Sequence, residues 1–225
     1  MGKDNQPKHR QQDRDLRRRA AVRQPYERLL IVCEGEKTEP QYLDEIRQEL
    51  RLATAHVQVR PSGFGTEPLQ VVEFAEHLFR HGDRAIGVAA QEFDRVIAVF
   101  DRDDHRTYHA ALAKAEDLNE RLTNDERRRI PFEAVPSVPC FELWLLLHFE
   151  DIQAPIHRNE VYERLRKHLP GYDKGQPGHW AKTKDLLGDA SERAQARSEA
   201  TSAFDGEMPY TGMSLLVGRL LHLKD

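Results

Sequence analysis

Two acidic clusters, each placed directly after an apolar run, are the residues of this chain best suited to chemistry. Glu34 follows the run Leu29–Cys33, and Asp101 and Asp103 follow the run 96–100. Carboxylates that meet in one place repel each other unless a cation lies between them. Because Mg²⁺ prefers oxygen ligands and commonly serves phosphate chemistry, the two clusters predict a magnesium site.

The runs that precede these carboxylates are typical of strands. A continuous apolar run of about five residues suits a strand that is buried on both faces of a parallel sheet. We expect strands at 28–33, 56–60, 95–100 and 130–135. In such sheets, functional groups gather outside the carboxyl ends of the strands. If the strand order reverses between the first and third strands, Glu34 lies beside the two aspartates.

Apolar residues at helical spacing predict the remaining elements. The expected helices cover 38–52, 68–81, 108–122, 137–149, 159–168, 178–198 and 213–223. Thr38 and Gln41 match a capping box at the start of the first helix, and Pro139 suits an early turn of the fourth. The order indicates an α/β fold: a doubly wound, mainly parallel four-stranded sheet, with helices on both faces and a C-terminal helical extension.

Length and charge limit the organisation of the chain. Its 225 residues suit one α/β domain with an added lobe, or two small domains. We expect a flexible basic arm at 1–25, an α/β domain at 26–155 and a helical extension packed on it at 156–225. The net charge of −4 means that any nucleic-acid binding must use local basic patches.

The chain has no feature of a membrane or secreted protein. No apolar run approaches the roughly 20 residues that span a bilayer, and no apolar segment follows the basic N-terminus. Cys33 and Cys140 lie far apart in apolar surroundings, as expected of reduced core thiols. We therefore expect a cytoplasmic protein without a membrane partner. The sequence leaves the oligomeric state open, a homo-oligomer included.

Basic residues near the expected site are candidates for phosphate contacts. Lys37 lies at the start of the first helix, whose N-terminus attracts anions. Lys174 and Lys182 accompany aromatic residues in the last third of the chain, an arrangement that suits a nucleic acid. The basic arm adds Arg17, Arg18 and Arg19. A solvated charged surface is the alternative for the arm and for Lys174 and Lys182.

Glu142 is a carboxylate in strongly apolar surroundings, between Phe141 and Leu143. Burial of a carboxylate is costly unless it is paired or bound to a metal ion. Glu142 lies in the first turn of the expected helix that follows the fourth strand, so it is a further candidate metal ligand; a salt bridge to an arginine is the alternative. Glu39, by contrast, is interpreted as a favourable charge in a first helical turn.

Three blocks of the sequence resemble the RloB-like family in this order: Ile31–Pro40 (IVCEGEKTEP), Phe100–Asp103 (FDRD) and Pro139–Phe149 (PCFELWLLLHF). The resemblance covers about residues 26–225. That family is similar to Toprim domains, which occur in topoisomerases, primases and nucleases. The resemblance implies a Toprim-like fold of four parallel strands in which the first and third are neighbours.

The resemblance also implies roles for individual residues. The Toprim glutamate, which acts as general acid or base, falls on Glu34, and the aspartates that hold Mg²⁺ (or Mn²⁺) fall on Asp101 and Asp103. Arg106 stands where the usual Toprim pattern has a glycine. RloB-like proteins are associated with ABC/SMC-like ATPases of phage defence, which implies an effector nuclease with such a partner.

Three hypotheses of function result. The first is a magnesium-dependent nuclease of anti-phage defence that hydrolyses DNA or RNA, transfer RNA included, with Lys174 as an electrophilic helper. The second is a catalytically inactive Toprim-like module that binds nucleic acid or the ATPase, which Arg106 and the acidic net charge favour. The third is a small-molecule phosphotransferase at the same edge of the sheet.

Overall fold

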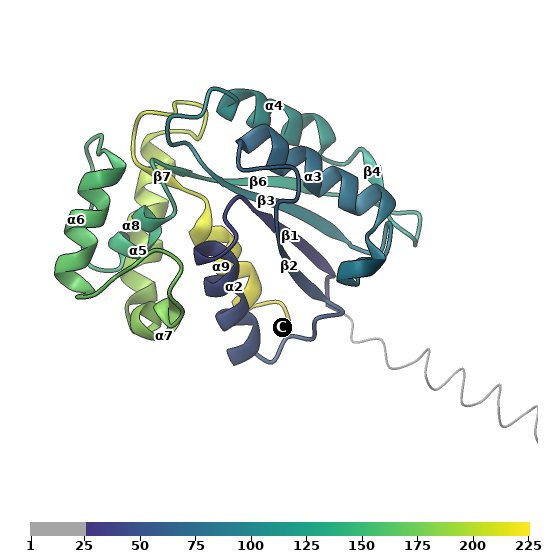
Figure 1. Ribbon diagram of the computed structural model, residues 1–225, viewed down its shortest axis with the longest axis horizontal. Helices are drawn as coiled ribbons and strands as arrows, with labels where there is room; N and C mark the ends of the chain where they lie inside the picture. Colours follow the sequence, from purple (N-terminus) through teal and green to yellow (C-terminus); the bar gives the residue numbers. More distant parts are fainter. Residues whose placement is uncertain (1–25) are drawn as a thin grey trace, which may run out of the picture.

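The computed structural model describes residues 26–225. The predicted basic arm, with Arg17, Arg18 and Arg19, lies outside the described residues and stays a prediction. The described part is an α/β fold with a central five-stranded sheet and helices against both of its faces (Figure 1). None of the helices between residues 26 and 225 combines the length and the apolar character that a membrane span requires.

The central sheet has the strand order β2-β1-β3-β6-β7. Its strands are β1 (Leu29–Cys33), β2 (Val57–Pro61), β3 (Arg95–Asp101), β6 (Phe132–Val138) and β7 (Tyr210–Thr211). The first four are parallel, and β7 pairs antiparallel with β6. The four predicted parallel strands are confirmed, and the first and third are neighbours as expected. A small separate hairpin consists of β4 (Leu122–Thr123) and β5 (Arg129–Ile130).

Alternating side chains explain why the strands are apolar at every position. Leu29, Ile31 and Cys33 of β1 contribute to one hydrophobic cluster, whereas Leu30 and Val32 contribute to the other. Successive side chains of a strand point to opposite faces, so a strand covered on both sides needs apolar residues throughout.

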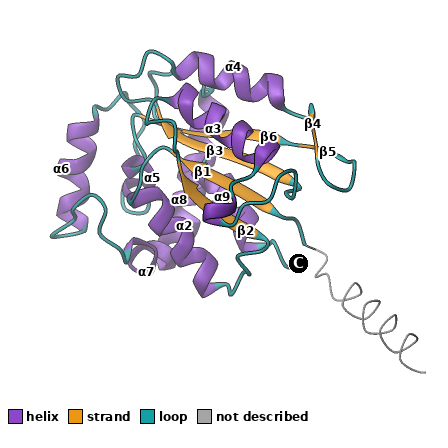
Figure 2. Ribbon diagram, turned by 45° about the vertical axis from the view of Figure 1, so that its right-hand side comes forward, coloured by secondary structure: helices purple, strands orange, loops and turns teal. Residues whose placement is uncertain are grey.

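Helices cover the two faces unequally (Figure 2). The first face carries α3 (Pro68–His81) and α4 (Tyr108–Leu118), whose apolar residues join the cluster of Leu30. The helices on the other side are α2 (Thr38–Glu49), α5 (Glu142–Leu147), α6 (Arg158–His168), α7 (His179–Thr183), α8 (Leu187–Ala200) and α9 (Met213–Leu221). Two 3₁₀ turns, η1 (Arg84–Ile86) and η2 (Lys184–Leu186), complete the fold. The C-terminal helices thus share one hydrophobic core with the sheet.

Three details of the prediction are wrong. The helix expected from residue 137 begins only at Glu142, because β6 continues to Val138. The helix expected at 178–198 is divided into α7, η2 and α8. Thr38 does not cap α2: Lys37 holds the N-cap position, and the Thr38 hydroxyl accepts a hydrogen bond from the backbone of Gly175.

The strand order reverses beside β1. The connection through α2 places β2 on one side of β1, and the connection through α3 places β3 on the other. In doubly wound sheets, such a reversal opens a crevice outside the carboxyl ends of the two central strands, where ligands bind. The fold therefore directs attention to the residues that follow β1 and β3.

Candidate functional site

The carboxyl ends of β1 and β3 bring Glu34 and Asp101 together. Cys33 pairs with Val99 in the sheet, and the backbone N–H of Glu34 donates to the Val99 carbonyl at 2.9 Å. The Glu34 carboxylate then accepts a hydrogen bond from the backbone N–H of Asp101 at 2.8 Å. The register of β1 and β3 therefore holds one carboxylate oxygen of Glu34 next to the backbone of Asp101.

Asp101 is buried, with 4% of its surface exposed. Burial raises its pKa well above the usual range, and the charges of Glu39, Glu34 and Glu142 raise it further. Electrostatic coupling of this kind requires that the carboxylates lie near one another. Glu34, Glu39, Asp101, Asp103 and Glu142 thus form one group of five, called here the acidic site.

Glu39 belongs to the acidic site, although the sequence interpretation gave it only a helix-end role. Its side chain is buried and lies back over Gly35, where a Cβ would overlap its Oε2 atom. Burial raises the pKa of Glu39 to about 7, and the charges of Glu142 and Glu34 contribute to the increase. The helix-end interpretation did not include burial, which places this carboxylate among the others.

Three carboxylate oxygens of the acidic site are buried without a hydrogen-bond partner. They are Glu39 Oε2, Asp103 Oδ1 and Glu142 Oε2. Glu142 is fully buried, and its other oxygen accepts a hydrogen bond from the Tyr172 hydroxyl at 2.8 Å. A buried acceptor left without a partner destabilises a fold by about 1–3 kcal/mol. The donor set of the acidic site therefore fits a hard cation with oxygen ligands.

Asp103 has an arginine partner that the sequence interpretation did not identify. Arg158, the first residue of α6, donates from Nη1 to Asp103 Oδ2 at 2.6 Å. Burial nevertheless raises the pKa of Asp103 above its usual range, although the charges of Arg158 and Lys174 oppose that increase. The backbone of Asp103 adopts a positive φ of 33°, and its N–H donates to the carbonyl of Pro139.

His105 is a second residue that the sequence interpretation missed. Its Nε2 lies 3.2 Å from Glu34 Oε1, and its Nδ1 lies 3.3 Å from Glu67 Oε1. Glu34, Asp103 and His105 each offer a possible ligand atom, and these atoms all lie within 4.8 Å of one another. A histidine two residues after the Asp-x-Asp pair is a weak signal by itself, because its ring depends on the conformation of the loop.

The predicted basic residues lie at different distances from the acidic site. Desolvation lowers the pKa of Lys174, but the charges of Glu142, Tyr162 and Asp101 outweigh it and raise the pKa above its usual range. Lys37 is exposed at the N-cap of α2, where its side chain lies against Gly175. Both residues therefore lie at the carboxyl edge of the sheet.

Lys182 is not brought to the acidic site. It is exposed on α7, which packs along the second half of α2 through the hydrogen bond from the Trp180 backbone to Glu45. The acidic site, by contrast, lies at the first turn of α2.

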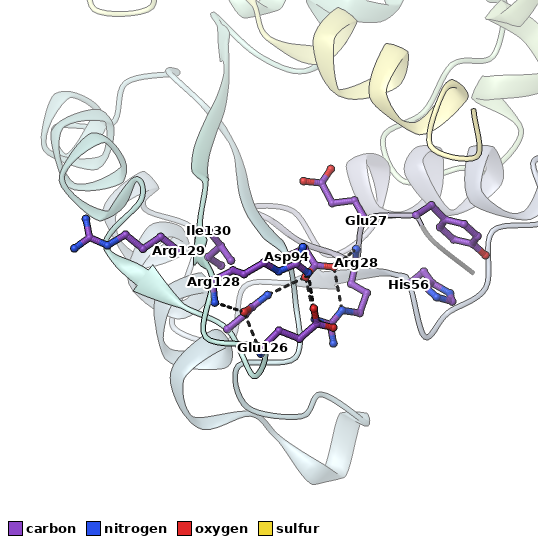
Figure 3. A pocket seen from close by; sticks show the side chains of 10 residues that line it. Glu27, Arg28, His56, Asp94, Glu126, Arg128, Arg129 and Ile130 are labelled. Atoms are coloured by element: carbon purple, nitrogen blue, oxygen red, sulfur yellow. Dashed lines mark hydrogen bonds and ion pairs between the residues drawn. The ribbon is translucent and has the colours of Figure 1, made fainter. Parts of the chain in front are cut away.

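A separate cavity of about 460 Å³ lies at the opposite end of the strands (Figure 3). Arg28 and Asp94, which precede β1 and β3, face each other there at 2.9 Å. Arg128 lies 3.0 Å from the same Asp94 oxygen and 2.9 Å from Glu126. Because these charges neutralise one another, their arrangement favours a structural role, and the carboxyl edge stays the stronger candidate for chemistry.

One comparison with known proteins finds a family whose model covers nearly all of the described fold. The family model described as RloB-like protein matches residues 29–220. The matched range includes the sheet and all five carboxylates of the acidic site. No curated protein and no solved structure matches the chain.

Proposed function

The chain belongs to the RloB-like family, and from this premise we propose that it is a magnesium-dependent nuclease that hydrolyses phosphodiester bonds at the acidic site. The observation that carries the proposal is the presence of three buried carboxylate oxygens without hydrogen-bond partners among five converging carboxylates. Two permanent cations, Arg158 and Lys174, face these five groups. The excess of negative charge favours a divalent ion.

Asp101 and Asp103 are the residues that would hold the ion, with Glu34 and Glu142 as further ligands. A bound Mg²⁺ or Mn²⁺ would stabilise the negative charge that develops on the scissile phosphate. Asp101 offers the side chain for this role, because its backbone N–H, and not its carboxylate, is used in the contact with Glu34.

Glu34 is the proposed general base. Burial raises its pKa above the usual value, the hydrogen bond from the Asp101 backbone and the nearby His105 ring oppose the increase, and the charge of Asp103 adds to it. A carboxylate with a raised pKa accepts a proton from an attacking water more readily at neutral pH. The hydrogen bond from the Asp101 backbone holds the carboxylate in place for this transfer.

Lys174 and Lys37 support a phosphate-containing substrate. Both lie at the edge of the acidic site and are exposed to solvent. Cations in this position attract the phosphates of a nucleic acid and compensate for the negative field of the carboxylates. We propose RNA or DNA as the substrate, with transfer RNA as one RNA to test.

The family membership suggests the biological setting. We propose that the protein acts in the cytoplasm as an effector of anti-phage defence, together with an ATPase of the ABC/SMC-like type. The family resemblance supports this setting, and a co-purification with a candidate ATPase tests the partner.

The nuclease proposal is tested with plasmid DNA, single-stranded DNA and total RNA, each with Mg²⁺, Mn²⁺ or EDTA. We expect metal-dependent cleavage that Asp101→Asn and Glu34→Gln abolish. Asp104→Asn is the matched control, because Asp104 is exposed in the same loop, and it should keep full activity. Intact nucleic acids under every condition, with the ATPase present, would refute the proposal.

Two observations favour a second candidate, a nucleic-acid or ATPase binding module without catalysis. Arg158 already neutralises Asp103 at 2.6 Å, and Arg106 replaces the usual Toprim glycine. Such a module would bind nucleic acid in a gel-shift assay without metal, and Asp101→Asn would leave that binding unchanged. A nuclease would instead lose cleavage in the same variant.

A further inference from the structure

His105 is held between a carboxylate inside the acidic site and one outside it. Its Nε2 faces Glu34 Oε1 at 3.2 Å, and its Nδ1 faces Glu67 Oε1 at 3.3 Å. Histidines that bind metal ions are typically held in this way. The hydrogen bond at Nδ1 fixes the ring, and the lone pair of Nε2 is then available to bind the ion.

The outer carboxylate is itself held in place. Glu67 is the N-cap residue of α3, and its Oε2 accepts a hydrogen bond from the Thr107 hydroxyl at 2.7 Å. The ring of His105 is therefore oriented by a carboxylate that two different elements position.

The spacing of the inner groups suits one ion. The possible ligand atoms of Glu34, Asp103 and His105 all lie within 4.8 Å of one another. Two ligands at right angles, each about 2.1 Å from an ion, lie about 3 Å apart. The 3.2 Å between Glu34 Oε1 and His105 Nε2 is close to that value.

An independent observation also indicates a ligand at this place. The Asp103 side chain is 9% exposed, and its Oδ1 is buried without a partner, although Arg158 binds the other oxygen. The charge of the fully buried Glu142 acts on Asp103, and Glu142 Oε2 also has no partner. Hydrogen bonds within the cluster therefore leave these two buried oxygens without a partner.

We propose that Glu34, Asp103 and His105 bind one divalent transition-metal ion, with His105 Nε2 as a direct ligand. This inference deepens the proposed function. It rests on that proposal in one respect, namely that the acidic site binds a cation. An imidazole ligand favours transition-metal ions, whereas Mg²⁺ prefers oxygen ligands. The site should therefore prefer Mn²⁺ to Mg²⁺, and His105 should provide that preference.

Pulsed electron paramagnetic resonance of Mn²⁺ bound to the full chain tests the assignment, because it detects a directly coordinated ¹⁴N. We expect the nitrogen signal in the unmodified protein and its loss in His105→Gln, together with Mn²⁺ binding that is about tenfold or more weaker. Mg²⁺ affinity should change little in this variant. Glu67→Gln should weaken Mn²⁺ binding but keep the nitrogen signal.

His109→Gln is the matched control, since His109 is exposed on α4 and contacts the Phe204 carbonyl instead of the acidic site. It should keep both the affinity and the signal. Mn²⁺ bound without the ¹⁴N signal, or bound equally well by His105→Gln, overturns the inference. The resonance experiment does not depend on cleavage, so the two proposals can fail separately. A nitrogen-bound ion without nuclease activity refutes only the proposed function. Mg²⁺-supported cleavage without nitrogen coordination refutes only this inference.

Discussion

At the scale of single residues, Glu39 connects burial with pH. Its pKa of about 7 in the folded protein exceeds the ordinary value of 4.5, so the folded state binds a proton that the unfolded state releases. Stability of the metal-free protein should therefore be higher below about pH 5 and fall as the pH rises through about 7.

Glu39→Gln should reduce this dependence, and the raised pKa values of Glu34, Asp101 and Asp103 should account for the part that remains. At about pH 8 in EDTA, we expect the free energy of unfolding to increase by up to about 3 kcal/mol, and near pH 5 we expect little change. Urea denaturation at several pH values measures the difference. Glu36→Gln is the control, because Glu36 is exposed in the preceding loop. An equal gain at both pH values would show that the Glu39 charge is not the cause.

The sequence identified part of the acidic site at this scale. Glu34 and Asp101 could be predicted because strand ends determine their positions, and the register places them together. His105 could not, because the direction of its side chain depends on the conformation of a loop. Glu39 could not either, because a position in the first turn of α2 does not reveal that its side chain is buried. Arg158 could not either, since its contact with Asp103 spans 55 residues of the chain.

At the scale of elements, α6 matters because it delivers Arg158 to the acidic site. Asp103 is buried while Arg158 is about one-third exposed, so removal of the arginine leaves a buried charge without its partner. Arg158→Ala should lower the free energy of unfolding in EDTA by about 1–3 kcal/mol. Saturating Mn²⁺ should reduce this loss, since a bound cation compensates the same charge.

Thermal unfolding with and without Mn²⁺ measures both effects. Arg164→Ala is the matched control on the same helix, where Arg164 pairs with Glu150 outside the acidic site. The loss of stability in Arg164→Ala should be the same with and without Mn²⁺. If Mn²⁺ leaves the deficit of Arg158→Ala unchanged, the ion does not bind at Asp103.

The starts of β1 and β3 are joined by the charges around the opposite cavity. Burial would raise the pKa of Asp94, but hydrogen bonds from Arg28 outweigh it and hold the pKa below the usual value. Asp94 therefore stabilises the fold above about pH 4, and this contribution disappears as the pH falls through its lowered pKa.

Asp94→Asn should cost about 1–3 kcal/mol near neutral pH. The difference in the free energy of unfolding between the variant and the unmodified protein should become smaller below about pH 4. Urea denaturation at several pH values measures this difference. Asp83→Asn serves as the control, because Asp83 caps η1 and has no arginine partner among the described residues. A gap that stays constant with pH would exclude the ion pair as its origin.

Most elements could be predicted because their patterns are long. The runs in β1 and β3 and the helical spacing of α3 allowed one interpretation each. The segment around residues 137–141 did not, since an apolar sequence that joins a strand to a helix fits either structure. Strand β7 has two residues and follows from its pairing with β6, not from a pattern of its own.

At the scale of the whole molecule, a cation should stabilise the folded chain. A ligand at about 100 times its dissociation constant stabilises the native state by about 2.7 kcal/mol. For a protein of this size, the melting temperature should then increase by about 5–10 °C. Differential scanning fluorimetry with Mn²⁺ measures the shift, which Asp101→Asn should reduce and Asp104→Asn should keep. No shift at millimolar Mn²⁺ would contradict a cation site.

The positions of Arg158 and Lys174 also have a consequence for synthesis on the ribosome. All five carboxylates precede residue 143, whereas both cations follow residue 157. A nascent chain therefore exposes the negative groups before their counter-charges emerge from the exit tunnel. Mutual repulsion should delay closure of that sheet edge until the later helices have been translated.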